Sequence, residues 1–158
     1  MNIDSVLSLE NLRFGDKIKI DFDVKINRDR QEEIYIPAML IQPYIENVFK
    51  HGLLHKKGDK ELTVLFEERD GKFYCEIKDN GVGREKAKRL AQKTKKYKSF
   101  STEANRKRID LLNEIYNNEI VLEISDVYAG QEDTGTMIQL WLPIVDYDLQ
   151  TETNHSQE

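Results

Sequence analysis

The sequence predicts an α+β domain, a two-layer α/β sandwich in which helices cover one face of a mixed, mostly antiparallel sheet. One segment alternates strictly between apolar and polar residues, as a half-buried strand does. The predicted elements follow the order strand, helix, strand, strand, helix, strand, strand. A length of 158 residues, with 39% apolar and 34% charged residues, is typical of one globular domain.

The alternating segment, residues 17–26, is the first predicted strand and has one apolar and one charged face. Its apolar face consists of Ile18, Ile20, Phe22, Val24 and Ile26. A helix is predicted from Pro37 to about His51, because apolar residues recur there at helical spacing. Pro43 should lie in the first turn of this helix or kink it, and Gly52 should end it.

Residues 62–67 and 72–79 are predicted to pair as a hairpin through Arg69-Asp70-Gly71. A charged segment, residues 84–101, follows and precedes a second helix at about 102–116. Two further strands, 120–125 and 135–142, complete the sheet, and Pro143 ends the predicted core.

Composition excludes several classes of protein. The net charge of −5 speaks against a general nucleic-acid binder. Cys75 is the one cysteine of the sequence, so no internal disulfide can form, which fits a reducing compartment. No apolar stretch approaches the roughly 20 residues that span a bilayer, and residues 1–10 lack the pattern of a signal peptide.

A glycine-rich loop follows the predicted strand at 72–79. Asp79-Asn80-Gly81-Val82-Gly83 combines a carboxylate with two glycines, which suits a site where one acceptor contacts a ligand and the backbone comes close to it. Asn80-Gly81 is also an ordinary turn pair, so the loop alone is equally typical of a turn.

The first helix carries a polar patch opposite its apolar stripe, formed by Glu46, Asn47, Lys50 and His51. Most such patches are solvated helix faces. The alternative is a metal–phosphate site, because an asparagine oxygen suits Mg²⁺ and a lysine can meet a phosphate as a point charge.

Residues 84–98 contain eight positive charges against Glu85 alone. This segment could be a solvated surface helix, an RNA contact or a lid over an anionic ligand. Ser99, Ser101 and Thr102 follow it and can cap the next helix, whose N-terminus is suited to phosphate oxygens. Gly135-Thr136 marks either simple strand entry or a small residue and a hydroxyl beside a bound base.

Three motifs together resemble those of sensor histidine kinases. Residues 42–52 resemble the N box of that family, residues 79–83 the G1 box and residues 135–143 the closing strand, in the same order. The resemblance covers residues 7–144 and is closest to the LytS/YehU type. That type shares the GHKL (Bergerat) ATPase fold with gyrase B, MutL and an ATP-dependent heat-shock chaperone.

The resemblance implies a site for ATP and Mg²⁺. Asn47 would hold the metal, Lys50 and His51 would face the phosphates, and Glu46 would assist phosphoryl transfer. Asp79 would accept a hydrogen bond from the adenine amino group, and Thr136 would support the base. The remaining implied contacts come from the loop and from a lid at residues 84–102, namely Gly81, Gly83, Ser99, Ser101 and Thr102.

Two departures from the family pattern are visible. Residues 99–102 contain no glycine where many histidine kinases have a second glycine-rich box. Pro43 stands where gyrase-like relatives carry their catalytic base, so we expect weak ATP hydrolysis.

The resemblance also implies a division of the chain. Residues 1–145 would be the ATP-binding catalytic domain, with 1–15 as a lead-in from a dimerisation domain, and 146–158 a disordered polar tail. None of His51, His55 and His155 lies on a long helix ahead of the domain. We therefore expect a cytoplasmic fragment of a longer sensor anchored in the inner membrane, monomeric and inactive alone.

The implied function is donation of the γ-phosphoryl group of ATP to a histidine on the absent phospho-acceptor domain. A response regulator would act downstream in this two-component system, with no nucleic acid as partner and no membrane contact by the domain itself. Two alternatives remain open on the same fold. One is a non-catalytic nucleotide-sensing module, and the other is a serine kinase of the anti-sigma type.

Overall fold

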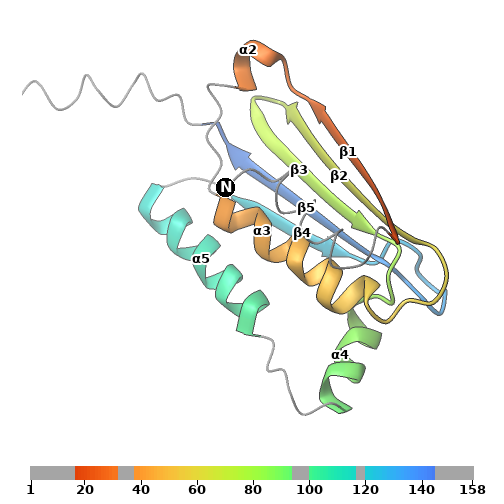
Figure 1. Ribbon diagram of the computed structural model, residues 1–158. Helices are drawn as coiled ribbons and strands as arrows, with labels where there is room; N and C mark the ends of the chain where they lie inside the picture. Colours follow the sequence, from red (N-terminus) through yellow and green to blue (C-terminus); the bar gives the residue numbers. More distant parts are fainter. Residues whose placement is uncertain (1–16, 32–37, 94–99, 117–119, 145–158) are drawn as a thin grey trace, which may run out of the picture.

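The computed structural model describes residues 17–31, 38–93, 100–116 and 120–144. Five strands form one sheet in the order β1-β2-β3-β5-β4 (Figure 1). The strands are β1 (Ile18–Lys25), β2 (Lys60–Arg69), β3 (Lys72–Asp79), β4 (Val121–Ser125) and β5 (Thr136–Pro143). β1 runs parallel to β2, and the other neighbouring pairs are antiparallel. The predicted mixed, mostly antiparallel sheet is confirmed.

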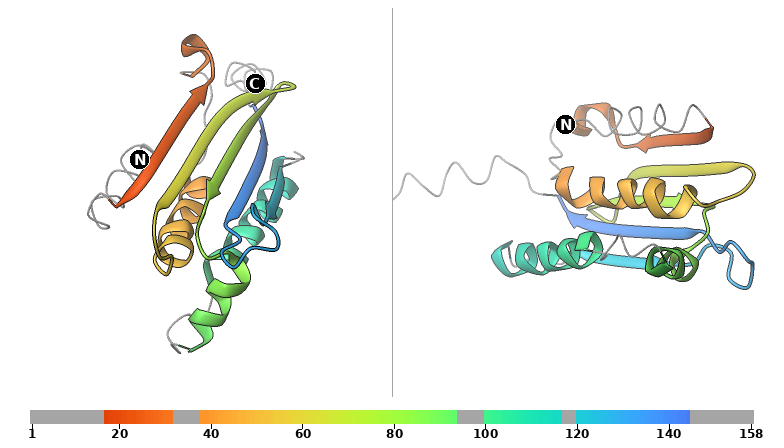
Figure 2. Two further views of the ribbon diagram at one scale, coloured as in Figure 1. Left: turned by 90° about the vertical axis from the view of Figure 1, so that its right-hand side faces the viewer. Right: turned by 60° about the horizontal axis from the view of Figure 1, so that its bottom comes forward.

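The helices are α2 (Arg28–Gln31), α3 (Ala38–Asn47), the π-helix η1 (Val48–Leu53), α4 (Arg84–Lys93) and α5 (Phe100–Tyr116). η1 continues directly from α3. α3 and α5 lie side by side against the sheet, and α4 lies beyond the end of η1 (Figures 1 and 2). This arrangement is the predicted α+β sandwich.

Strand alternation decides which side chains face the helices. Phe73, Cys75 and Ile77 of β3 are buried in the core that the helices cover, together with Ile138, Leu140 and Leu142 of β5. Asp79 continues the same alternation at the end of β3 and is paired with Thr136 at the start of β5. The two polar residues therefore lie on the helix side, at one end of the apolar core.

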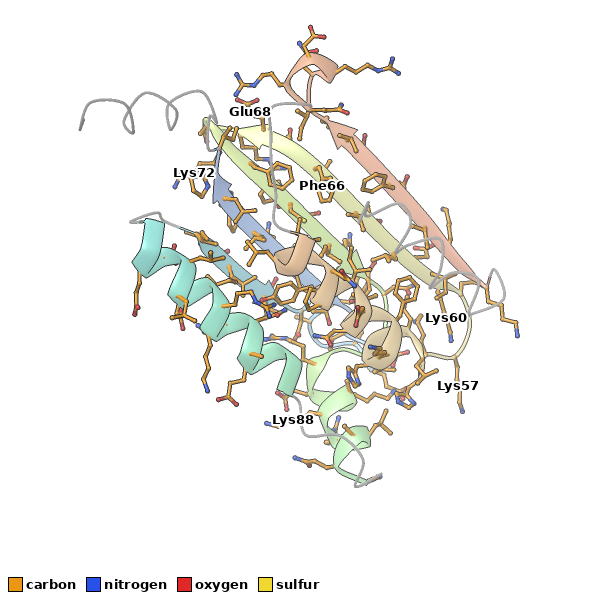
Figure 3. The ribbon with its side chains drawn as sticks, turned by 60° about the vertical axis from the view of Figure 1, so that its left-hand side comes forward. Lys57, Lys60, Phe66, Glu68, Lys72 and Lys88 are labelled. Carbon is orange, nitrogen blue, oxygen red and sulfur yellow. The ribbon has the colours of Figure 1, made fainter. Side chains whose placement is uncertain are left out.

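The opposite end of the core is aromatic. The Phe66 ring lies 5.3 Å, centroid to centroid, from both the Phe22 and the Phe73 ring. Figure 3 shows Phe66, Glu68 and Lys72 towards one end of the sheet and Lys88 of α4 towards the other. The polar end of the core is thus the end near α4.

The hairpin prediction is confirmed. β2 and β3 meet at Asp70 and Gly71, whose φ angles of 52° and 71° are those of a tight turn that follows the twist of the strands. One detail of the helix prediction was wrong, because Gly52 does not end the helix, which continues to Leu53. Pro43 lies inside α3 rather than in its first turn, and the alternative of a kink at this residue stays a prediction.

α2 and α4 were absent from the predicted order of elements. α2 has four residues and buries none of them, so it left no apolar periodicity in the sequence. α4 likewise buries none of its residues, and it confirms the surface helix that was one of the alternatives for residues 84–98. Ser99, the lead-in 1–15 and the tail 146–158 lie outside the described residues, as do the side chains of Ser101 and Thr102. Across the part of the chain that is described, every helix is too short or too polar to cross a bilayer.

Candidate functional site

A cavity of about 510 Å³ opens at the polar end of the core, between α3–η1, α4 and the sheet. Its volume lies in the range of small-molecule sites. The helix side contributes Tyr44, Asn47, Val48, His51 and Gly52. The sheet side contributes Asp79, Ile124, Thr136 and Ile138, and the remaining wall consists of Gly83, Arg84, Ala87, Lys88, Ala91 and Gln92.

Only two of the four residues in the predicted polar patch face the cavity. Asn47 and His51 line the cavity, on a stripe with Tyr44 and Val48. Glu46 and Lys50 do not line it. They pair with each other outside the cavity, with 2.9 Å between Lys50 Nζ and Glu46 Oε2. Glu46 also accepts a hydrogen bond from Gln42.

The end of this helix wall is a π-helix, a rare form that is frequent at functional sites. Within it, the Gly52 carbonyl accepts a hydrogen bond of 3.0 Å from the Val82 amide. A Cβ on Gly52 would lie 3.1 Å from Asp79 Oδ1, so the missing side chain lets the carboxylate reach the helix. The predicted role of Gly52 was a helix stop, and its contact with Asp79 was not predicted, although the glycine directly follows the polar patch.

Asp79 is 2% exposed, on the sheet side of the cavity. Its Oδ1 accepts a hydrogen bond of 2.7 Å from the Gly81 amide. Burial raises the pKa of Asp79 to about 6, against the opposing effects of the Gly81 and Thr136 amides and of the Lys56 charge. At neutral pH the group is therefore a buried carboxylate, which can only accept hydrogen bonds.

The loop after Asp79 is packed too tightly for side chains. A Cβ on Gly81 would lie 2.5 Å from the backbone of Gly52 and 2.6 Å from Asp79 Oδ1. Gly83 has a φ of +81°, in the left-handed region that favours glycine, and a Cβ there would overlap Thr134. Gly81 thus packs against Gly52 and Asp79 without lining the cavity, whereas Gly83 lines it.

Asn80 holds the same loop against the start of β2. Its Oδ1 accepts a hydrogen bond of 2.9 Å from the Glu61 amide, and its Nδ2 donates one of 3.1 Å to the Asp59 carbonyl. Asn80 therefore anchors the loop, and the adjacent Asp79 carboxylate faces the cavity.

α4 presents one face to the cavity, with Arg84, Ala87, Lys88 and Ala91 at helical spacing. Ion pairs with the β4–β5 loop hold this helix in place. Arg84 lies 3.2 Å from Asp126, and Lys86 lies 2.8 Å from Asp133. The predicted basic segment therefore contains two groups. Lys88 lines the cavity and can meet an anion there, whereas Lys86 is bound to the acidic loop. Arg84 does both, since it lines the cavity and is paired with Asp126.

The chemistry of His51 and Asn47 decides what could bind at the helix wall. Burial lowers the pKa of His51, and the nearby His55 and Lys50 charges act in the same direction, so its imidazole is neutral at neutral pH. The described residues contain no cluster of three histidine, cysteine, aspartate or glutamate side chains that could hold a metal. A Mg²⁺ ion held by the Asn47 oxygen, with water and ligand oxygens completing the shell, fits this donor set.

No family model matches the chain. Curated sensor kinases resemble it in sequence. The sensor histidine kinase YpdA of Escherichia coli (strain K12) is 32% identical over 81 residues, 51% of this chain and 14% of that protein. The sensor protein LytS of Bacillus anthracis is 30% identical over 138 residues, 84% of this chain and 23% of that protein. The chain thus spans less than a quarter of the length of these two relatives.

Solved structures of histidine kinases share the fold. The mycobacterial sensor histidine kinase MprB matches with a TM-score of 0.58 at 18% identity, over 91% of this chain and 93% of that chain. The histidine kinase domain of a blue-light activated kinase from Erythrobacter litoralis EL346 matches with a TM-score of 0.57 at 14% identity. That match covers 87% of this chain and 60% of the other.

Proposed function

Because this chain is a catalytic domain of the LytS type of sensor histidine kinase, we propose that it binds Mg-ATP and donates the γ-phosphoryl group to a histidine of another domain. The observation that carries this proposal is the buried Asp79 carboxylate, which faces a cavity with apolar walls and has cations at its rim.

The sheet side of the cavity suits a purine base. Asp79 is an acceptor for the exocyclic amino group of adenine, a group that guanine lacks at the same ring position. Ile124 and Ile138 offer flat apolar contact to the ring, and Thr136 lies beside the carboxylate. Gly81 and Gly83 keep the loop backbone close to this position.

The helix wall and α4 suit the triphosphate. Asn47 provides an oxygen for Mg²⁺, which neutralises phosphate charge when it is bound. Lys88 supplies positive charge from α4, and neutral His51 can donate or accept one hydrogen bond. Arg84 could add its charge only by leaving Asp126. Lys50 could reach a phosphate only by leaving Glu46, so its predicted contact requires a side-chain rearrangement.

Phosphoryl transfer depends on position and charge rather than on a covalent step of the protein. The bond between the γ-phosphorus and the oxygen that bridges it to the β-phosphate breaks as a bond to an imidazole nitrogen forms. ADP leaves, and the imidazole proton passes to solvent. The accepting histidine would belong to a dimerisation domain of the same parent, with a response regulator downstream. On this proposal the domain acts in the cytoplasm as part of a membrane-anchored sensor.

One observation favours a non-catalytic nucleotide-sensing module as a second candidate. Glu46 and Lys50, which the family resemblance would assign to transfer, are paired with each other and do not line the cavity. Such a module would bind Mg-ATP without transferring phosphate, even when a phospho-acceptor domain is added.

Calorimetric titration with Mg-ATP tests the binding step. Asp79→Asn should weaken binding about tenfold or more, because it removes a charged acceptor. Asp21→Asn makes the same chemical change at an exposed position of β1 and should leave binding unchanged. Asn47→Ala should weaken binding of Mg-ATP but not of adenosine. Unchanged ATP affinity in Asp79→Asn would contradict the proposed site.

A further inference from the structure

The ion pair between Arg84 and Asp126 lies at the edge of the cavity. Arg84 is the first residue of α4, and it lines the cavity. Asp126 directly follows β4, two residues after Ile124, which also lines the cavity. Asp126 itself is not among the described residues that line it. A cation of the cavity wall is therefore held by a carboxylate that lies outside the cavity.

The geometry of this pair uses the guanidinium incompletely. Arg84 Nη2 and Arg84 Nε donate hydrogen bonds of 3.2 and 3.3 Å to the same oxygen, Asp126 Oδ1. The strongest arginine–carboxylate pairs instead form two parallel hydrogen bonds of about 2.7–2.9 Å. The Arg84 side chain is 50% exposed and that of Asp126 35%, and water weakens such a pair further. Another anion can therefore displace Asp126 from Arg84.

The position of α4 does not depend on this pair. Lys86 Nζ lies 2.8 Å from Asp133 Oδ1 and 3.1 Å from Glu132 Oε1, both on the β4–β5 loop. Asp133 also accepts a hydrogen bond of 3.5 Å from Lys56, which follows η1. Asp133 thus connects α4 with the end of the helix wall. Arg84 can change its partner while these contacts keep α4 in place.

We propose that Asp126 competes with the phosphate groups of the bound nucleotide for Arg84, and so sets the affinity of the site for a phosphorylated ligand. This inference rests on the proposed function, because it takes the occupant of the cavity to be a nucleotide. Phosphate oxygens match the planar guanidinium with two parallel hydrogen bonds, which Asp126 does not form in the ligand-free domain.

Asp126→Asn keeps the size of the side chain and removes its charge. We expect Mg-ATP to bind about two- to fivefold more tightly, measured by calorimetry, because Arg84 no longer has to leave a carboxylate. This change corresponds to about 0.4–1 kcal/mol, the range of an exposed ion pair. Adenosine, which has no phosphate, should bind equally well to the variant and to the unchanged domain, measured by NMR titration.

Glu132→Gln is the matched control. It removes the same charge from the same loop, but its partner Lys86 does not line the cavity. The control should leave the Mg-ATP affinity unchanged, and it separates the release of Arg84 from a general loss of negative charge near the site. Both variants should melt close to the unchanged domain, because exposed ion pairs contribute little to stability.

A second background tests whether Asp126 acts through Arg84. Arg84→Gln alone should weaken the binding of Mg-ATP. Adding Asp126→Asn to Arg84→Gln should give no gain, because the carboxylate then has no guanidinium to hold. A gain of the same size in that background would mean that Asp126 only repels the phosphates at a distance, and it would refute the competition.

The outcomes separate this inference from the function on which it rests. If the unchanged domain binds Mg-ATP and Asp126→Asn binds it no more tightly, the competition is refuted and the proposed function stands. Weaker binding by Asp126→Asn would mean that Asp126 orients Arg84 towards the ligand, which also refutes the competition. If the unchanged domain and Asp126→Asn both bind no Mg-ATP, the proposed function and this inference fail together.

Discussion

Replacing Asp79 by asparagine should make the ligand-free domain gain stability relative to the unchanged domain as the pH rises. Burial raises the pKa of Asp79 from 3.8 to about 6. A carboxyl whose pKa is higher in the folded state favours folding most below pH 3.8, and this contribution is lost as the pH rises through 6. The full loss corresponds to about 3 kcal/mol, since one pKa unit is about 1.4 kcal/mol.

About half of this loss, some 1.4 kcal/mol, should develop between pH 5 and pH 8. Asparagine has one acceptor oxygen where the carboxylate has two, so it satisfies the Gly81 and Thr136 amides less well. That cost is an offset independent of pH. The informative quantity is therefore the change with pH in the difference between the two free energies of unfolding.

Urea denaturation at pH 5, 6, 7 and 8 measures this difference, with Asp21→Asn as the control at an exposed position. The free energy of unfolding of Asp79→Asn minus that of the unchanged domain should increase by about 1.4 kcal/mol from pH 5 to pH 8. A difference that stays constant or falls over this range would refute the argument that burial makes the carboxylate unfavourable.

Three further predictions concern the same end of the core. Adenosine should bind more weakly as the pH falls below about 6, measured by NMR titration, because the protonated Asp79 carboxyl loses acceptor capacity. Gly81→Ala should cost about 1–3 kcal/mol in urea denaturation and weaken ATP binding, because its Cβ meets backbone at 2.5 Å. Gly71→Ala, with open space around it, should leave ATP binding unchanged. Burial raises the pKa of the Cys75 thiol, so a thiol reagent should react with it only after urea unfolds the domain, and reaction with the native domain would contradict its placement in the core.

Local signals in the sequence were enough for most of the fold. Alternation in residues 17–26 and the Asp70-Gly71 turn pair gave strands and a hairpin that the structure confirms. These signals succeed because side-chain period and turn chemistry are properties of a few consecutive residues. α4 confirms a surface helix, one of the alternatives left open for residues 84–98, and charge alone could not decide between those alternatives.

The site was only partly predictable. Motif resemblance selected Asn47, His51, Asp79, Gly83 and Thr136, all of which line the cavity. It could not separate Asn47 from its neighbours Glu46 and Lys50, because helical spacing places the four polar residues within one patch. Whether a given residue faces the cavity depends on how α3 and η1 are rotated against the sheet, and no short stretch of sequence specifies that rotation.

The sequence alone therefore determined the strands, the main helices and the three motifs that identify the kinase family. Tertiary structure decided which polar groups are removed from water. The pKa of Asp79 is raised because β3, β5 and η1 enclose it, and Tyr44 and Asn105 are buried because α5 packs against α3. Burial arises from segments distant in the chain, so it is a property that only the folded arrangement can give.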